Sequence, residues 1–141
     1  MNGRAAILAA AMAVTACGPT TDSLHIVRES VVAGNAFPPF DRTVGGSVAA
    51  SLERELLALP PKTVTKFCPN DSGMRYRLSF NSGSPSTAVL EAGGCRYAYM
   101  SPSDVRETTE DFWAHLAGAL GFYSRGHDLF PTELPHAAPT R

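Results

Sequence analysis

Residues 74–80 read Met-Arg-Tyr-Arg-Leu-Ser-Phe, and this stretch decides the fold class of the chain. Apolar and polar side chains alternate along it with a period of two, which is the pattern of a β-strand with one buried face. Turn-forming residues lie on both sides of it, at 69–73 and 81–85. We therefore predict a strand here, with its apolar face packed on a core.

Further strands are predicted before and after this one. Residues 24–32 are rich in β-branched side chains, and residues 87–91 and 95–100 are short strand-like segments separated by a pair of glycines. Residues 63–67 are a weaker candidate. Because short turns join the strands of the middle region, we expect them to pair antiparallel as a meander.

Two segments have the periodicity of amphipathic helices. In residues 48–59 the large apolar side chains recur at spacings of four, four and three, with Ser47 placed as the N-cap. The proline pair that follows is expected to end this helix. A second helix is predicted to enter at residues 101–104, to bury an apolar stripe within 112–120 and to stop at Gly121.

Length and composition limit the chain to one small domain. The chain has 141 residues, of which 44% are hydrophobic and 18% are charged, which is enough to bury a single core. We predict an α+β domain over residues 24–122, with an antiparallel sheet of three to five strands and both helices on one face. Residues 123–141 are rich in proline, and we expect them to form a disordered tail.

The same numbers exclude two classes of partner. A formal net charge of -1 leaves no basic field that would hold nucleic acid. No apolar run reaches the roughly 18 residues that a membrane-spanning helix needs. We therefore expect neither a nucleic-acid partner nor a transmembrane helix.

The first residues have the pattern of a secretory signal. A basic start and a short apolar stretch occupy residues 1–16, and Val14-Thr15-Ala16-Cys17 is similar to a bacterial lipobox. We predict a signal peptide over 1–16, lipidation of Cys17 and a short tether over 17–23. The mature chain would then be lipid-anchored on the extracytoplasmic face of the cell membrane. Ordinary cleavage after Ala16 is the alternative, and it would secrete a soluble protein.

Export gives the other two cysteines a structural role. Cys68 and Cys95 are 27 positions apart, and disulfides persist in exported proteins. A bridge between them would stabilise the fold by about 3 kcal/mol, because it restricts the unfolded chain. A zinc site is the competing interpretation, but no histidine pair lies near them in the sequence to complete a tetrahedral set.

The sequence contains no catalytic or metal-binding motif that we recognise. The histidines lie in no H-x-x-x-H or H-E-x-x-H arrangement, and no phosphate-binding glycine loop or serine-nucleophile motif is present. Asp71 is expected to cap its own turn, because the later glutamate of a calcium loop is missing. We therefore expect no cofactor, no metal and no enzymatic activity. The histidines are His25, His115, His127 and His136.

Two sets of side chains have both a binding and a structural interpretation. Tyrosines on the predicted strands would form a stacking platform for a sugar or peptide, or pack across strands, and we favour packing. Arginines would form a small basic patch or an ordinary solvated sheet face. These residues are Tyr76, Tyr97, Tyr99, Arg75, Arg77 and Arg96.

The chain also resembles a known group of sequences. The residues that carry the resemblance are Asp41-Arg42-Thr43-Val44, Leu56-Leu57-Ala58-Leu59-Pro60-Pro61, Cys68-Pro69-x-Asp71-x-Gly73-x-x-Tyr76-x-Leu78-x-Phe80 and Gly94-Cys95-Arg96. Together they are similar to small secreted proteins and lipoproteins common in high-GC Gram-positive bacteria. The resemblance covers about residues 24–121. It implies the Cys68–Cys95 bridge and these domain limits, and it implies no activity and no catalytic residue.

Three functions follow as hypotheses. The leading one is a non-enzymatic, lipid-anchored domain that binds an envelope or extracellular protein. The alternative is a small extracellular inhibitor of a secreted enzyme, with a loop at 70–73 or 81–85 presented beside the disulfide. The third is an enzyme whose site is visible only after folding, and a deep pocket that brings a carboxylate to His115 would favour it.

Overall fold

The computed structural model describes residues 21–31, 40–69, 71–81 and 86–122. The signal peptide, Cys17, most of the tether, the proline-rich tail, His127 and His136 lie outside the described residues, as do most of the 81–85 loop and Asn70. Within the described part of the chain, no helix is long and apolar enough to cross a membrane.

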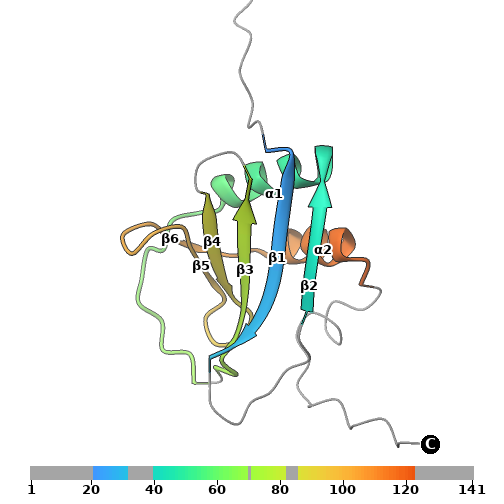
Figure 1. The fold of residues 1–141 in the computed structure, drawn as a ribbon. Helices are drawn as coiled ribbons and strands as arrows, with labels where there is room; N and C mark the ends of the chain where they lie inside the picture. Colours follow the sequence, from blue (N-terminus) through green and yellow to red (C-terminus); the bar gives the residue numbers. More distant parts are fainter. Residues whose placement is uncertain (1–20, 32–39, 70, 82–85, 123–141) are drawn as a thin grey trace, which may run out of the picture.

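The described residues form six strands and two helices. All neighbouring strands pair antiparallel, in the order β2-β1-β3-β4-β5-β6, and both helices lie behind the sheet in the view of Figure 1. The predicted α+β class is therefore confirmed, with six strands instead of three to five. The elements are β1 (Ser23–Ser30), β2 (Phe40–Gly45), α1 (Gly46–Ala58), β3 (Met74–Phe80), β4 (Thr87–Glu91), β5 (Tyr97–Tyr99), β6 (Val105–Glu107) and α2 (Glu110–Leu120).

Strand β3 lies inside the sheet and has the predicted alternation. Its apolar side chains are all buried, while Arg75, Arg77 and Ser79 are not. The register places Leu78 opposite Ile26 of β1 and opposite Ala88 of β4, so that these three buried residues share the helix-covered face. Burial on this face stabilises the sheet because each large apolar side chain contributes about 1.5–3 kcal/mol when it leaves water.

The structure corrects the prediction for the second helix. Residues 101–104 form a turn, in which the Asp104 N–H donates to the Ser101 carbonyl, and this turn joins β5 to β6. Glu107, expected in the helix, belongs to β6. The N-cap is Thr109, whose side chain accepts a hydrogen bond from the Phe112 N–H. The helix stops as predicted at Gly121, whose φ of 73° favours glycine.

The first helix is rotated relative to its prediction. Ser47 is not the N-cap, because that position belongs to Gly45, which makes no side-chain cap. Val48 is 44% exposed, and Ala49 is buried in its place. Glu53, which is not part of the apolar stripe, is also buried, and its Oε2 atom has no hydrogen-bond partner among the described residues. The predicted end before the prolines is confirmed.

Two smaller expectations about strands are also wrong. The strand predicted at 95–100 contains only Tyr97–Tyr99. Residues 63–67 form no strand, although the preceding Pro61 makes an isolated bridge to Arg106. Those residues instead follow the outer edge of the sheet, and their path is what defines the candidate site.

Candidate functional site

Residues 60–69, called here the stapled segment, are fixed at both ends. They leave α1 and run beside the β5–β6 edge toward the end of the sheet where β3 begins (Figure 1). At the start, the Lys62 N–H donates to the Val105 carbonyl and the Glu107 N–H donates to the Pro60 carbonyl, each at 2.9 Å. At the end, Cys68 and Cys95 form a disulfide with their Cα atoms 5.2 Å apart.

The predicted pairing of these cysteines is therefore present in the structure. Cys95 lies in the turn between β4 and β5, so the bridge fastens the stapled segment to that turn.

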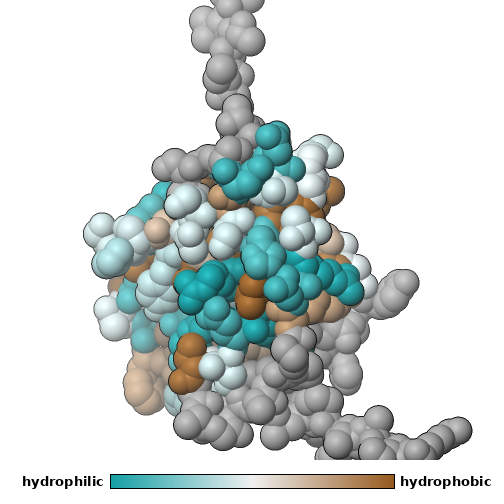
Figure 2. Space-filling view, viewed as in Figure 1, coloured by the Kyte–Doolittle hydropathy of each residue, from teal (hydrophilic) through white to brown (hydrophobic). Residues whose placement is uncertain are grey.

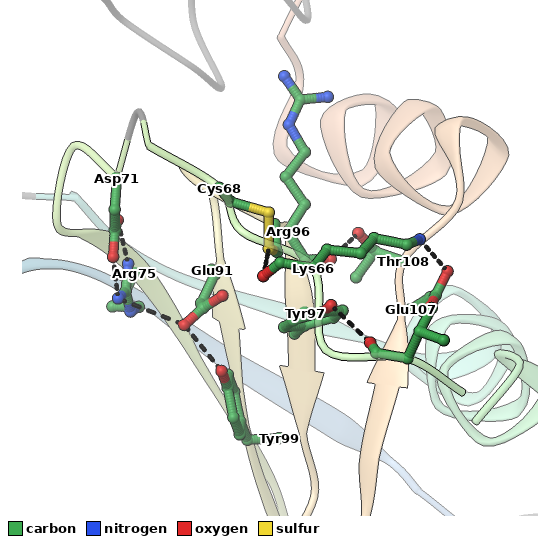
Figure 3. The surroundings of a disulfide bond; sticks show 12 residues. Lys66, Cys68, Asp71, Arg75, Glu91, Arg96, Tyr97, Tyr99, Glu107 and Thr108 are labelled. Atoms are coloured by element: carbon green, nitrogen blue, oxygen red, sulfur yellow. Dashed lines mark hydrogen bonds and ion pairs between the residues drawn. A yellow bond between two sulfur atoms is a disulfide. The ribbon is translucent and has the colours of Figure 1, made fainter. Parts of the chain in front are cut away.

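Contacts along the stapled segment hold it against the sheet. The Tyr97 hydroxyl donates to the Val64 carbonyl at 3.4 Å, and the Lys62 ammonium lies 4.6 Å from the centre of the Tyr97 ring. The Lys66 ammonium pairs with the Glu107 carboxylate at 2.8 Å, as Figure 3 shows. Cys95 Sγ lies 3.4 Å from the Lys66 carbonyl oxygen. Tyr97 is consequently buried beneath the segment.

Large apolar side chains are exposed on this fixed segment and just after the end of β1. Phe67 is 92% exposed, Val64 is 57% exposed and Val31 is 61% exposed. Val31 belongs to the same end of the sheet, because its N–H donates to the Gly73 carbonyl just before β3. Figure 2 shows hydrophobic side chains at the lower left, over the end where β1 ends, and largely hydrophilic side chains over the middle of the sheet.

An ion-pair network lies next to the disulfide. Arg75 binds Asp71 through both carboxylate oxygens at 3.0 and 2.9 Å, and it lies 3.4 Å from Glu91. Glu91 in turn accepts a hydrogen bond from the Tyr99 hydroxyl at 2.9 Å (Figure 3). Burial, helped by this hydrogen bond and by the charge of Glu91, raises the pKa of Tyr99 to about 12. The network holds the turn before β3 against β4.

Asp71 caps its own turn, as predicted. Its Oδ1 atom accepts a hydrogen bond from the Gly73 N–H at 2.9 Å. The hydrogen bond from Arg75 lowers the pKa of Asp71 to about 2, and the Gly73 N–H and the charge of Arg75 act in the same direction. The charged carboxylate is therefore the form that the folded protein favours.

Replacing Asp71 with asparagine is expected to lower the free energy of unfolding at pH 7 by about 1 kcal/mol, since solvent screens this partly exposed pair. The folded pKa lies below its ordinary value of 3.8, so the stabilisation exists above about pH 4 and disappears as the pH falls toward 2. Urea unfolding of both proteins at pH 7 and pH 2 measures this. If the two proteins differ in free energy of unfolding by the same amount at pH 2 as at pH 7, the charge of Asp71 is not the source of the stabilisation.

The tyrosines and arginines do not form the binding surfaces that were considered. Tyr76 is buried on the helix-covered face, edge-on to the Trp113 ring, so the tyrosine platform is absent. Arg75 is held by carboxylates, and Arg77 pairs with Glu29 at 2.9 Å. Arg96 lies away from them and pairs with Glu110 at 3.1 Å. The arginines are therefore neutralised structural residues rather than a basic patch.

His115 lines an open groove of about 690 Å³ between α1 and α2. Its Nδ1 atom lies 2.7 Å from the Glu55 carboxylate, whose other oxygen accepts from the Ser51 hydroxyl at 3.1 Å. The hydrogen bond to Glu55 raises the pKa of His115. Because the carboxylate lies between serine and imidazole, the histidine does not contact the hydroxyl as a nucleophilic triad requires. The pair links the two helices on their exposed side.

The remaining histidine of the described residues is also paired. His25 Nε2 lies 2.6 Å from the Asp41 carboxylate on the helix-free face of the sheet. In the described residues, no group of three or more histidine, cysteine, aspartate or glutamate side chains is arranged to hold a metal ion.

No sequence pattern marked Phe67 and Val64 as a binding feature. A strand was predicted over both residues, and alternation within that strand would have buried one of them. Their position between a proline pair and a cysteine was the only available signal. Searches against family models, curated proteins and solved structures found no match for this chain.

Proposed function

We propose that this chain is an exported, lipid-anchored domain that binds a protein of the cell envelope or its surroundings through the stapled segment. The observation that carries the proposal is the exposure of Phe67 on a segment whose ends are both fixed. Aromatic side chains often supply a large share of the binding free energy at protein interfaces. Less conformational entropy is lost on binding when such a side chain is carried by a segment that is already fixed. Val64 and Val31 would extend the apolar contact.

The two ends of the sheet would have different roles in an anchored domain. The N–H groups of Asp22 and Ser23 bind the Asn81 side chain, so the chain enters at the end where β3 finishes. The disulfide lies near the end where β3 begins. The eight residues of β1 separate these ends by about 26 Å. A lipid on Cys17, four residues before Thr21, would therefore leave Phe67 facing away from the membrane.

Cys17→Ala is expected to move the protein from the membrane fraction to the soluble fraction, because the thiol that would carry the acyl chains is removed. Fractionation of expressing bacteria, with labelled palmitate as a second readout, measures this. Thr20→Ala is the matched control, since it changes the tether and leaves the thiol in place. If Cys17→Ala stays in the membrane fraction, the lipobox interpretation is wrong.

The binding function is tested by co-purification from membranes with matched variants. The unsubstituted chain should recover a partner that Phe67→Ala loses and Val48→Ala retains, because Val48 is an exposed apolar residue on α1, on the other side of the sheet. Phe67→Ala removes a side chain that is almost fully in solvent, so it should not affect folding. Recovery of the same proteins by all three would contradict the proposal.

A further inference from the structure

We propose that residues 63–67 bind as an added strand in the substrate cleft of an exported endopeptidase, with the Phe67 side chain in an apolar specificity pocket. The inference rests on the proposed role of the stapled segment as the docking site, and it names the class of partner. A substrate cleft of this kind recognises an extended main chain and one side chain together. The stapled segment offers both.

Part of the main chain of the segment contacts the sheet, and part of it has no partner in the described part of the chain. The carbonyls of Val64 and Lys66 face the sheet, because they meet the Tyr97 hydroxyl and Cys95 Sγ. The N–H groups of Thr63, Thr65 and Phe67 belong to residues that are exposed. In the described residues, nothing pairs with these three N–H groups.

The fixed ends make this segment a better inhibitor than substrate. The pairing of Pro60 and Lys62 with β6 holds one side of the Phe67–Cys68 peptide bond, and the disulfide at Cys68 holds the other. Little conformational entropy is then lost on binding. If the bond were hydrolysed, the two new ends would stay in the cleft, because each remains attached to the sheet.

The charges near Phe67 favour an apolar pocket over an acidic one. The neighbouring Lys66 is already paired with Glu107, and Asp71 is paired with Arg75. The segment is also internal to the chain, so a cleft that reads a free carboxyl or amino terminus does not fit it. An endopeptidase specific for large apolar side chains meets both conditions.

The test uses the full chain with its disulfide intact, both unsubstituted and as the Cys17→Ala variant. Each purified protein is added to chymotrypsin and to subtilisin. Hydrolysis of a short chromogenic peptide is measured at increasing concentrations of the protein. We expect competitive inhibition of at least one enzyme at micromolar protein or below. Phe67→Ala should weaken it about 100-fold, as expected for a central aromatic anchor. Phe67→Tyr should largely preserve it, and Val48→Ala should leave it unchanged.

Three outcomes would overturn the inference: no inhibition of either enzyme, equal inhibition by Phe67→Ala, or rapid degradation of the unsubstituted chain by both enzymes. Circular dichroism of each variant confirms that it is folded. The anchor is judged separately, because fractionation of Cys17→Ala does not depend on inhibition. If co-purification depends on Phe67 but neither enzyme is inhibited, the docking role stands and the endopeptidase assignment fails.

Discussion

Replacing Trp113 with alanine is expected to lower the free energy of unfolding by about 3–5 kcal/mol, the usual cost of removing a large buried aromatic side chain. Trp113 is 1% exposed. Its ring lies edge-on to Tyr76 of β3 and to Phe112 of α2, with centroids 6.1 and 6.0 Å away. The variant would lose both ring contacts and leave a cavity between α2 and the sheet.

Trp113 also carries a hydrogen bond that the variant would remove. Its indole N–H donates to the Thr108 hydroxyl at 2.8 Å, and that hydroxyl donates to the Arg96 carbonyl. The connection between β6 and α2 is thereby tied to the start of β5. Without the indole, the Thr108 oxygen loses its donor, which adds to the cost of the cavity.

Urea unfolding, monitored by far-ultraviolet circular dichroism, measures this loss of stability. Tryptophan fluorescence is unsuitable because the variant lacks the only tryptophan of the chain. Trp113→Phe is the matched control, since it keeps an aromatic ring and loses the indole N–H and part of the volume. It should lose clearly less stability than Trp113→Ala. A domain of this size has a total stability of about 5–15 kcal/mol, so Trp113→Ala is expected to come close to unfolding it. A loss below about 1 kcal/mol would contradict the packing described here.

The double variant Cys68→Ala with Cys95→Ala is expected to lower the free energy of unfolding by about 3 kcal/mol, because the unfolded chain regains the freedom of the closed loop. The bridge also holds the stapled segment over Tyr97. Its loss should therefore free residues 63–69 from the sheet, and amide hydrogen exchange should increase there and at Tyr97 before it increases in β3.

Two measurements check this prediction. The intact mass of the oxidised chain should be two hydrogens lower than after reduction, and reductant should destabilise the unsubstituted chain but not the double variant. Ser101→Ala with Ser103→Ala is a control on a different surface turn, and it should leave the exchange of residues 63–69 unchanged. Two thiols that react with an alkylating agent without reductant would contradict the bridge.

The predictable part of the fold consists of the elements with a buried stripe. Strand β3, strand β4 and the stripe of α2 follow from hydrophobic periodicity, because a single face of each is packed on the core. Strand β2 was missed because three of its four middle residues are exposed, as expected of an edge strand. Strand β6 has three residues and no fully buried side chain, so no pattern identifies it.

The candidate site could be predicted only in part. The prediction of export and the cysteine count together pair Cys68 with Cys95, because a disulfide needs only two thiols and an oxidising compartment. The exposure of Phe67 does not follow from its neighbours in sequence. It arises because Pro60 and Lys62 pair with β6, which turns the segment outward along the edge. The Glu55–His115 pair likewise depends on how the two helices cross.

The sequence by itself determined the α+β class and the disulfide pair, because alternation, helical periodicity and cysteine count are local properties of the chain. Lipidation at Cys17 stays a prediction. Only the tertiary structure decided which side chains are left in solvent. The rotation of α1 buries Ala49 and Glu53 and exposes Val48, and the edge pairing of the stapled segment exposes Phe67. Both outcomes depend on contacts between residues far apart in the sequence, which local patterns do not contain.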